Sequence, residues 1–97
     1  MSFSDLSFQK RADGAHFSNT EINGYKLSVV AGNMMYSEPR INLESVDDYV
    51  TFECAVLYKG EFVTEQFVTN INDDVVGYMT RDDIGSLIHA IETGQKI

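Results

Sequence analysis

The amino-acid sequence predicts a small α+β domain, an antiparallel sheet of four to five strands with one C-terminal helix packed on one face. Apolar and polar residues alternate in short segments separated by turn-forming residues, which is typical of antiparallel strands. Near the C-terminus the apolar residues change to helical spacing, at Ile84, Leu87, Ile88 and Ile91. A chain of 97 residues has room for one hydrophobic core, so residues 1 to 97 are expected to form a single domain.

The strongest local signal is the dipeptide Asn23-Gly24. A type I′ turn needs positive φ at both central residues, and Asn-Gly tolerates this best. The dipeptide therefore predicts a hairpin of strands 15 to 22 and 25 to 31. The expected register pairs Ile22 with Tyr25 and Glu21 with Lys26, and Leu27 and Val29 continue the apolar face.

A second hairpin is predicted around Lys59-Gly60. Residues 49 to 58 are rich in β-branched and aromatic types, and residues 61 to 68 would form the returning strand. In a two-residue turn, Glu65 would lie opposite Cys54, which requires an exposed edge or an extra residue in the turn. The same register pairs Val56 with Val63 and Phe52 with Phe67, on a core face of Val50, Phe52, Cys54 and Val56.

The remaining elements are shorter. Residues 5 to 10 are expected to form a first strand, and residues 75 to 78 a brief edge strand or a packed turn. Thr80 is a good N-cap for the C-terminal helix with Asp83 three residues later, and Gly94 is a natural end for that helix.

The segment from residue 32 to residue 48 is expected to be mostly irregular and exposed. Turn-forming residues interrupt any strand or helix period in it, namely Gly32, Asn33, Ser37, Pro39 and Asn42. Long loops in compact domains tend to be functional or disordered. This segment is therefore the first place to look for a binding surface.

Charge is distributed unevenly along the chain. The 15 acidic and 7 basic residues give a net charge of −8. Residues 38 to 83 carry eleven of the acids and only three of the bases, so the whole excess lies there. An acidic surface argues against direct binding of nucleic acid, because phosphate contacts need Lys and Arg. Any electrostatic partner is expected to be basic.

The sequence offers little for catalysis, a cofactor or a metal ion. The single cysteine, Cys54, falls on the expected core face, His89 lies opposite the apolar stripe of the helix, and His16 is interpreted as a surface residue. Asn70, Asn72 and Asp74 match the first positions of a calcium-binding EF-hand loop. Val75 and Arg81 then stand where that loop needs a glycine and a bidentate glutamate.

The cellular setting is expected to be the cytoplasm. A lone cysteine suits a reducing compartment, no apolar run approaches the ~18 residues that span a bilayer, and the N-terminus does not resemble a signal peptide. We therefore expect no membrane contact, and we expect the protein to act as a monomer.

Four parts of the chain carry a resemblance: Leu6-Ser7-Phe8, Asn23-Gly24-Tyr25 with Ser28-Val29-Val30, Glu53 to Leu57, and Asp74 to Thr80. They resemble a family of small phage-encoded proteins with a sheet-and-helix plan. The likeness runs over most of residues 6 to 91 and concerns a turn, core strands and a helix start. The chain departs from that family between Gly32 and Asp48, where it is longer and more acidic than the expected short glycine-rich loop.

In length and acidity the chain is also similar to phage anti-CRISPR proteins directed at the type I-F surveillance complex. This resemblance implies an inhibitor that mimics double-stranded DNA, with carboxylates occupying the positively charged DNA path in the cytoplasm of the host cell. DNA carries one charge per ~1.7 Å of axis, and spaced carboxylates can copy part of that array. Charge and position, not a family motif, select the candidate binding residues Tyr36, Glu38, Glu44, Asp47, Asp48, Glu61, Asp73 and Asp74.

Two alternatives stay open. The protein is a phage structural or assembly accessory protein if its acidic surface serves only solubility. An enzyme is the third possibility, without an identifiable nucleophile and base that would converge.

Overall fold

Two seven-residue strands joined at Asn23-Gly24 form the centre of the sheet in the computed structural model, which describes residues 1–97. They are β2 (His16–Ile22) and β3 (Tyr25–Ala31). Asn23 has φ 52° and Gly24 has φ 85°, as a type I′ turn requires. The predicted register is confirmed, with Ile22 opposite Tyr25 and Glu21 opposite Lys26.

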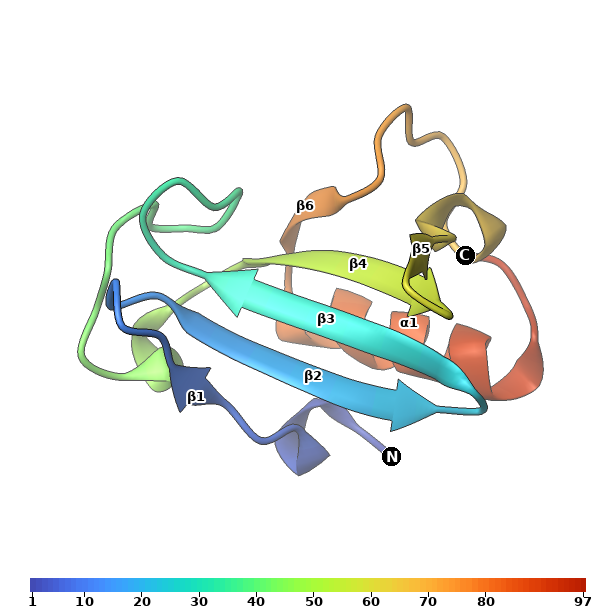
Figure 1. Cartoon of the computed structure of the whole chain (residues 1–97), viewed down its shortest axis with the longest axis horizontal. Helices are drawn as coiled ribbons and strands as arrows, with labels where there is room; N and C mark the ends of the chain where they lie inside the picture. The colour runs from blue at the N-terminus through green and yellow to red at the C-terminus, as the bar shows by residue number, and fades with distance from the viewer.

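The sheet is antiparallel and contains six strands (Figure 1). Strand β4 (Phe52–Tyr58) pairs with β3, and the other edge of β4 is shared by β5 (Glu61–Phe62) and β6 (Val76–Met79). Strand β1 (Gln9–Lys10) extends the sheet beyond β2. The predicted α+β class is confirmed, and the brief edge strand expected near residues 75 to 78 is β6.

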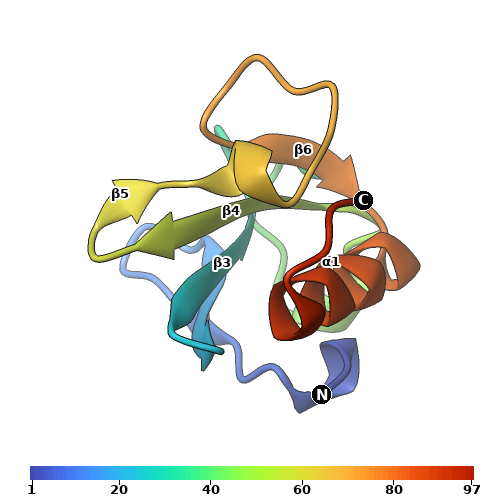
Figure 2. The same cartoon turned by 90° about the vertical axis from the view of Figure 1, so that its right-hand side faces the viewer.

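Helix α1 (Arg81–Thr93) covers one face of the sheet, as Figure 2 shows. Thr80 and Asp83 form the complete capping box, and Gly94 ends the helix with φ 74°. No helix is long and apolar enough to cross a membrane. The apolar stripe of α1 is fully buried against β2, β3 and β4, through Ile84, Leu87, Ile88 and Ile91.

The second hairpin begins in the predicted register but ends early. Leu57 pairs with Phe62 and Tyr58 with Glu61, yet the returning strand stops at Phe62 and a short 3-10 helix, η3 (Thr64–Gln66), follows. The strand prediction over residues 61 to 68 was therefore wrong beyond Phe62.

Thr64 explains this early end. Its buried hydroxyl accepts a hydrogen bond from the Val56 amide (2.9 Å) and donates one to the Asp74 carbonyl (2.6 Å). These bonds turn the chain out of the sheet, and β6 takes the vacated edge of β4. Consequently Phe52 lies opposite Met79 rather than Phe67, Cys54 lies opposite Val76, and Glu65 is exposed outside the sheet.

Two other predictions need correction. Val50 is 63% exposed instead of lying on the core face, because β4 begins only at Phe52. The first strand was predicted over residues 5 to 10 but spans only β1, since the chain before it forms the 3-10 helix η1 (Phe3–Asp5). The Asp5 carboxylate fixes that turn by accepting the Ser2 amide at 2.7 Å.

Candidate binding surface

The acidic loop, defined as residues 32–48, is irregular and mostly exposed, as predicted. Its only regular element is one turn of 3-10 helix, η2 (Val46–Asp48). Side chains nevertheless fix its path. The Ser37 hydroxyl accepts the Gly32 amide (3.1 Å) and donates to the Pro39 carbonyl (2.9 Å). Asn42 accepts the Asn33 amide at 2.8 Å and donates to the Asp13 carbonyl at 2.7 Å.

A buried pair, His16 and Tyr49, holds the middle of the acidic loop. The Tyr49 hydroxyl donates to the Ile41 carbonyl (2.7 Å) and accepts the Leu43 amide (2.9 Å). His16 Nε2 donates to the Leu43 carbonyl at 2.8 Å, and its ring packs edge-on against Tyr49. The interpretation of His16 as a surface residue was therefore wrong, since only 6% of it is exposed.

Arg81 fixes the end of the acidic loop from the first turn of α1. Its guanidinium donates to the carbonyls of Tyr49 (2.7 Å) and Asp47 (3.3 Å), and it stacks on the rings of Phe3 and Phe52. One of the few basic side chains is thus used to hold backbone carbonyls. It forms no ion pair with a carboxylate.

The structure divides the eight predicted binding residues into two groups. The acidic loop and the region around β5 lie toward opposite ends of the longest dimension, which is 34 Å (Figure 1). One group comprises Tyr36, Glu38, Glu44, Asp47 and Asp48 of the acidic loop. The other comprises Glu61 of β5 with Asp73 and Asp74 of the connection between η3 and β6. The eight candidate residues therefore form two separate patches.

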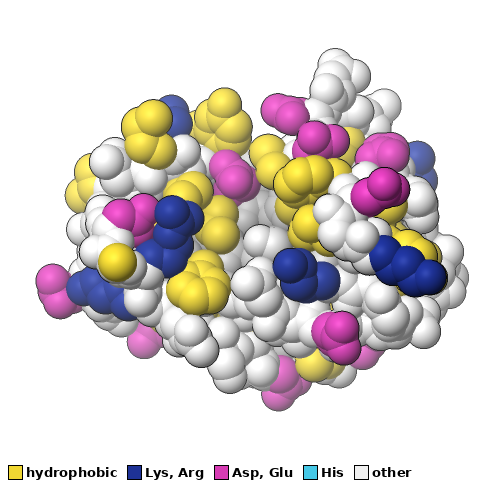
Figure 3. Space-filling model, viewed as in Figure 1, with side chains coloured by type: hydrophobic (Ala, Val, Ile, Leu, Met, Phe, Trp, Pro, Cys, Tyr) yellow, Lys and Arg dark blue, Asp and Glu magenta, His cyan; other side chains and the backbone are white.

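Most of these carboxylates have no basic partner. The structure contains three ion pairs, and only one of them, Glu44 with Lys10 at 3.4 Å, involves a predicted binding residue. Even there the Glu44 side chain is 97% exposed, so the pair leaves its carboxylate accessible. Figure 3 shows acidic side chains over β5 and the η3–β6 connection at the upper right, and others at the left. No basic side chain lies within 4 Å of the carboxylates of Glu38, Asp47, Asp48, Glu61, Asp73 and Asp74.

Sequence reasoning missed four residues of these surfaces. Glu65 joins Asp73 and Asp74 around an open hollow, because η3 turns it away from the sheet. Tyr78 lies beside Tyr36, and Arg40 and Glu53 contact Tyr36 from two other sides. Tyr78 and Glu53 reach Tyr36 because β6 pairs with β4. The spacing of residues along the sequence does not reveal that pairing.

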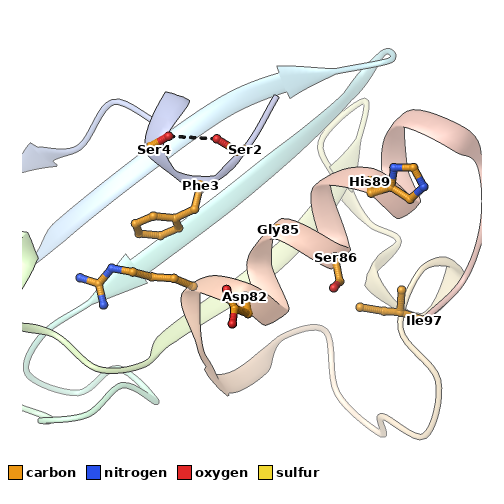
Figure 4. Close-up of a pocket in the computed structure, with 9 residues that line it drawn as sticks. Ser2, Phe3, Ser4, Asp82, Gly85, Ser86, His89 and Ile97 are labelled. Carbon is orange, nitrogen blue, oxygen red and sulfur yellow. Dashed lines mark hydrogen bonds between the residues drawn. The ribbon is translucent and has the colours of Figure 1, made fainter.

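The structure places the candidate catalytic residues in separate environments. Cys54 is buried, and burial raises the pKa of its thiol, with the charges of Glu53 and Asp83 raising it further. His89 is exposed on the outer side of α1, in an open hollow between η1 and α1 that also contains Asp82 and Ser86 (Figure 4). No hydrogen bond joins these three side chains, so they form no nucleophile and base pair.

The metal-ligating side chains do not gather either. No group of three or more His, Cys, Asp or Glu side chains is arranged to hold a metal ion. The EF-hand-like residues Asn70, Asn72 and Asp74 lie in the η3–β6 connection, where Asn70 has φ 63° and the Asp73 carboxylate accepts the Asp74 amide. These features are those of a turn.

No protein-family model, curated protein or solved structure matches the chain.

Proposed function

We propose that the protein is a non-catalytic inhibitor that binds a basic, DNA-binding surface of a host complex as a monomer in the host cytoplasm. Following the resemblance, the complex we propose is the type I-F CRISPR surveillance complex, and the protein is phage-encoded. The observation that carries the proposal is a set of exposed carboxylates without basic partners, held on a loop of fixed conformation.

The fixed conformation of the acidic loop and its carboxylates without basic partners both favour binding. A loop that is already ordered loses little conformational entropy when a partner docks, so more of the electrostatic attraction remains as affinity. Carboxylates without internal partners also need not break an ion pair first. A complementary surface rich in Lys and Arg would be attracted from a distance, and dissolved salt would weaken that attraction.

The test reverses three acids of the acidic loop, with Glu44→Lys, Asp47→Lys and Asp48→Lys combined in one variant. The loop anchors use the Asp47 carbonyl rather than its carboxylate, so circular dichroism should show a folded protein. A matched control changes the net charge equally elsewhere, with Glu21→Lys, Asp82→Lys and Glu92→Lys. Binding to purified type I-F complex is measured by size exclusion and by competition with target DNA, at low and high salt.

The proposal predicts that wild type and the control variant bind, that binding falls as salt rises, and that the loop variant neither binds nor blocks DNA. If the folded loop variant still blocks DNA loading fully, the contact surface is assigned instead to Glu61, Asp73 and Asp74, and these three acids are reversed next. If all six reversals leave binding intact, charge mimicry is wrong. If wild type itself binds no surveillance complex, the inhibitor proposal fails and the accessory-protein alternative is favoured.

A further inference from the structure

Strand β6 contains a bulge that displays one aromatic side chain. Phe52 pairs with Met79 and Cys54 with Val76, so the single residue Glu53 of β4 faces two residues, Gly77 and Tyr78, of β6. Bulges commonly redirect a side chain next to a functional site. Tyr78 has φ 57°, a left-handed conformation that bulky residues rarely adopt.

The bulge brings Tyr78 against Tyr36 of the acidic loop. The Tyr78 amide donates to the Tyr36 carbonyl at 2.9 Å, and the two ring centroids are 6.1 Å apart. Position 77 has no room for a side chain, because a Cβ there would lie 2.6 Å from the Cβ of Tyr36. The strained backbone and the missing side chain thus place two rings side by side.

Neither ring is buried by this arrangement. Tyr36 is 44% and Tyr78 49% exposed, although a strained residue that served the core would be expected to bury its ring. Exposed tyrosines at ordered positions are typical of the residues that dominate protein interfaces. Backbone strain that yields an exposed aromatic pair therefore points to a binding role.

The surroundings indicate what the pair would bind. The guanidinium of Arg40 already lies over the Tyr36 ring at 5.1 Å, so a planar cation packs on one ring of the pair. No cation lies over Tyr78. The half-buried Glu53 carboxylate accepts the Tyr36 amide at 3.0 Å and has no basic partner. An open ring face and an unpaired carboxylate together suit a planar cation.

We propose that Tyr36, Tyr78 and Glu53 form a docking site for an arginine side chain of the partner protein. Its guanidinium stacks on the open Tyr78 ring and pairs with the Glu53 carboxylate, beside the stack that Arg40 makes with Tyr36. Arginine is favoured over lysine because its planar group can stack and bond at the same time. This inference rests on the proposed function, from which it takes the basic character of the partner. It adds a specific contact for one arginine side chain, which charge mimicry alone does not provide.

The test variant is Tyr78→Asn. Asparagine tolerates the left-handed conformation, so the substitution removes the ring without adding backbone strain. Tyr58→Asn is the matched control, since Tyr58 is a similarly exposed strand tyrosine that carries Lys59 over its own ring. Net charge is unchanged in both variants.

Binding is measured against the purified surveillance complex and, separately, against glycine-spaced peptides with two arginines or two lysines. For the peptides the readout is perturbation of the tyrosine NMR signals. We expect Tyr78→Asn to weaken both the complex and the arginine peptide about five- to thirtyfold, with the lysine peptide binding more weakly to wild type. Tyr58→Asn should match wild type.

The outcomes separate this inference from the proposed function. Wild type that binds the complex, with a folded Tyr78→Asn variant of equal affinity, overturns the arginine site and leaves the inhibitor proposal standing. Wild type that binds the arginine peptide through Tyr78 but not the complex supports the site and rejects the proposed partner. Equal binding of the arginine and lysine peptides contradicts the preference for a guanidinium. A Tyr78→Asn variant that loses stability and binding in parallel shows that the ring is structural.

Discussion

Tyr49→Phe should loosen the acidic loop without changing any charge. The Tyr49 ring is 1% exposed, and phenylalanine fills almost the same volume, so packing in the core should persist. The lost hydroxyl makes two hydrogen bonds, one to the Ile41 carbonyl and one from the Leu43 amide. A typical hydrogen bond contributes about 0.5 to 1.5 kcal/mol net. The two together predict a loss of about 1 to 3 kcal/mol in the free energy of unfolding.

Urea denaturation followed by circular dichroism measures this change. For a domain of this size a loss of 1 kcal/mol also lowers the thermal midpoint by roughly 4 to 8 °C. Hydrogen exchange locates the effect, because the Leu43 amide should exchange faster in the variant while amides at the centre of β3 and β4 should not be selectively affected. Tyr58→Phe is the control, since the Tyr58 hydroxyl makes no hydrogen bond and the variant should match wild type.

Partner affinity should fall in Tyr49→Phe because a loosened loop must be ordered again on binding. The reasoning is refuted if the urea midpoint and the exchange rate of the Leu43 amide both equal those of wild type. A variant with a faster Leu43 amide but unchanged affinity would show instead that loop order does not contribute to binding.

Three further predictions concern the core. Ile88→Ala should destabilise the domain by about 2 to 4 kcal/mol, because the side chain is fully buried between α1 and the sheet; an unchanged urea midpoint would contradict this. The Cys54 thiol should react with a disulfide reagent only on unfolding, because its raised pKa keeps it protonated in the folded state. The same shift predicts that its contribution to stability is complete below the unfolded pKa of about 9 and is lost as pH rises above it, a dependence that Cys54→Ala should remove. Rapid labelling of the native protein at pH 8 would exclude a buried thiol.

Short sequence motifs predicted the turns and the helix start correctly, because these depend on residues that are close together in the sequence. Asn23-Gly24 specified both the turn and the register, and Thr80 with Asp83 specified the start of α1. The second hairpin failed because its return depends on the Thr64 hydroxyl reaching Val56 and Asp74, a contact between segments that propensity does not record. Lys59-Gly60 predicts the turn correctly, but the length of the returning strand depends on tertiary contacts.

His16 shows a different kind of failure. Side chains alternate between the two faces of a strand, and His16 is six residues from the inward-facing Ile22, so the predicted register already placed it on the core face. Its position in the strand, and not its polarity, decides its burial. Tyr78, in contrast, was beyond the reach of the pattern, because a bulge reverses the alternation at that residue.

The buried polar groups support the proposed binding surface over one that serves only solubility. Burial of a polar side chain is unfavourable unless its hydrogen bonds are satisfied. Three of the five buried polar side chains hold the acidic loop: His16 and Thr51 bond to it from outside, and Ser37 bonds within it. Solubility depends on the charge of a loop and is indifferent to its conformation. Binding depends on both. Buried hydrogen-bonding groups that hold a charged, irregular loop in one conformation are therefore what the proposed binding role requires.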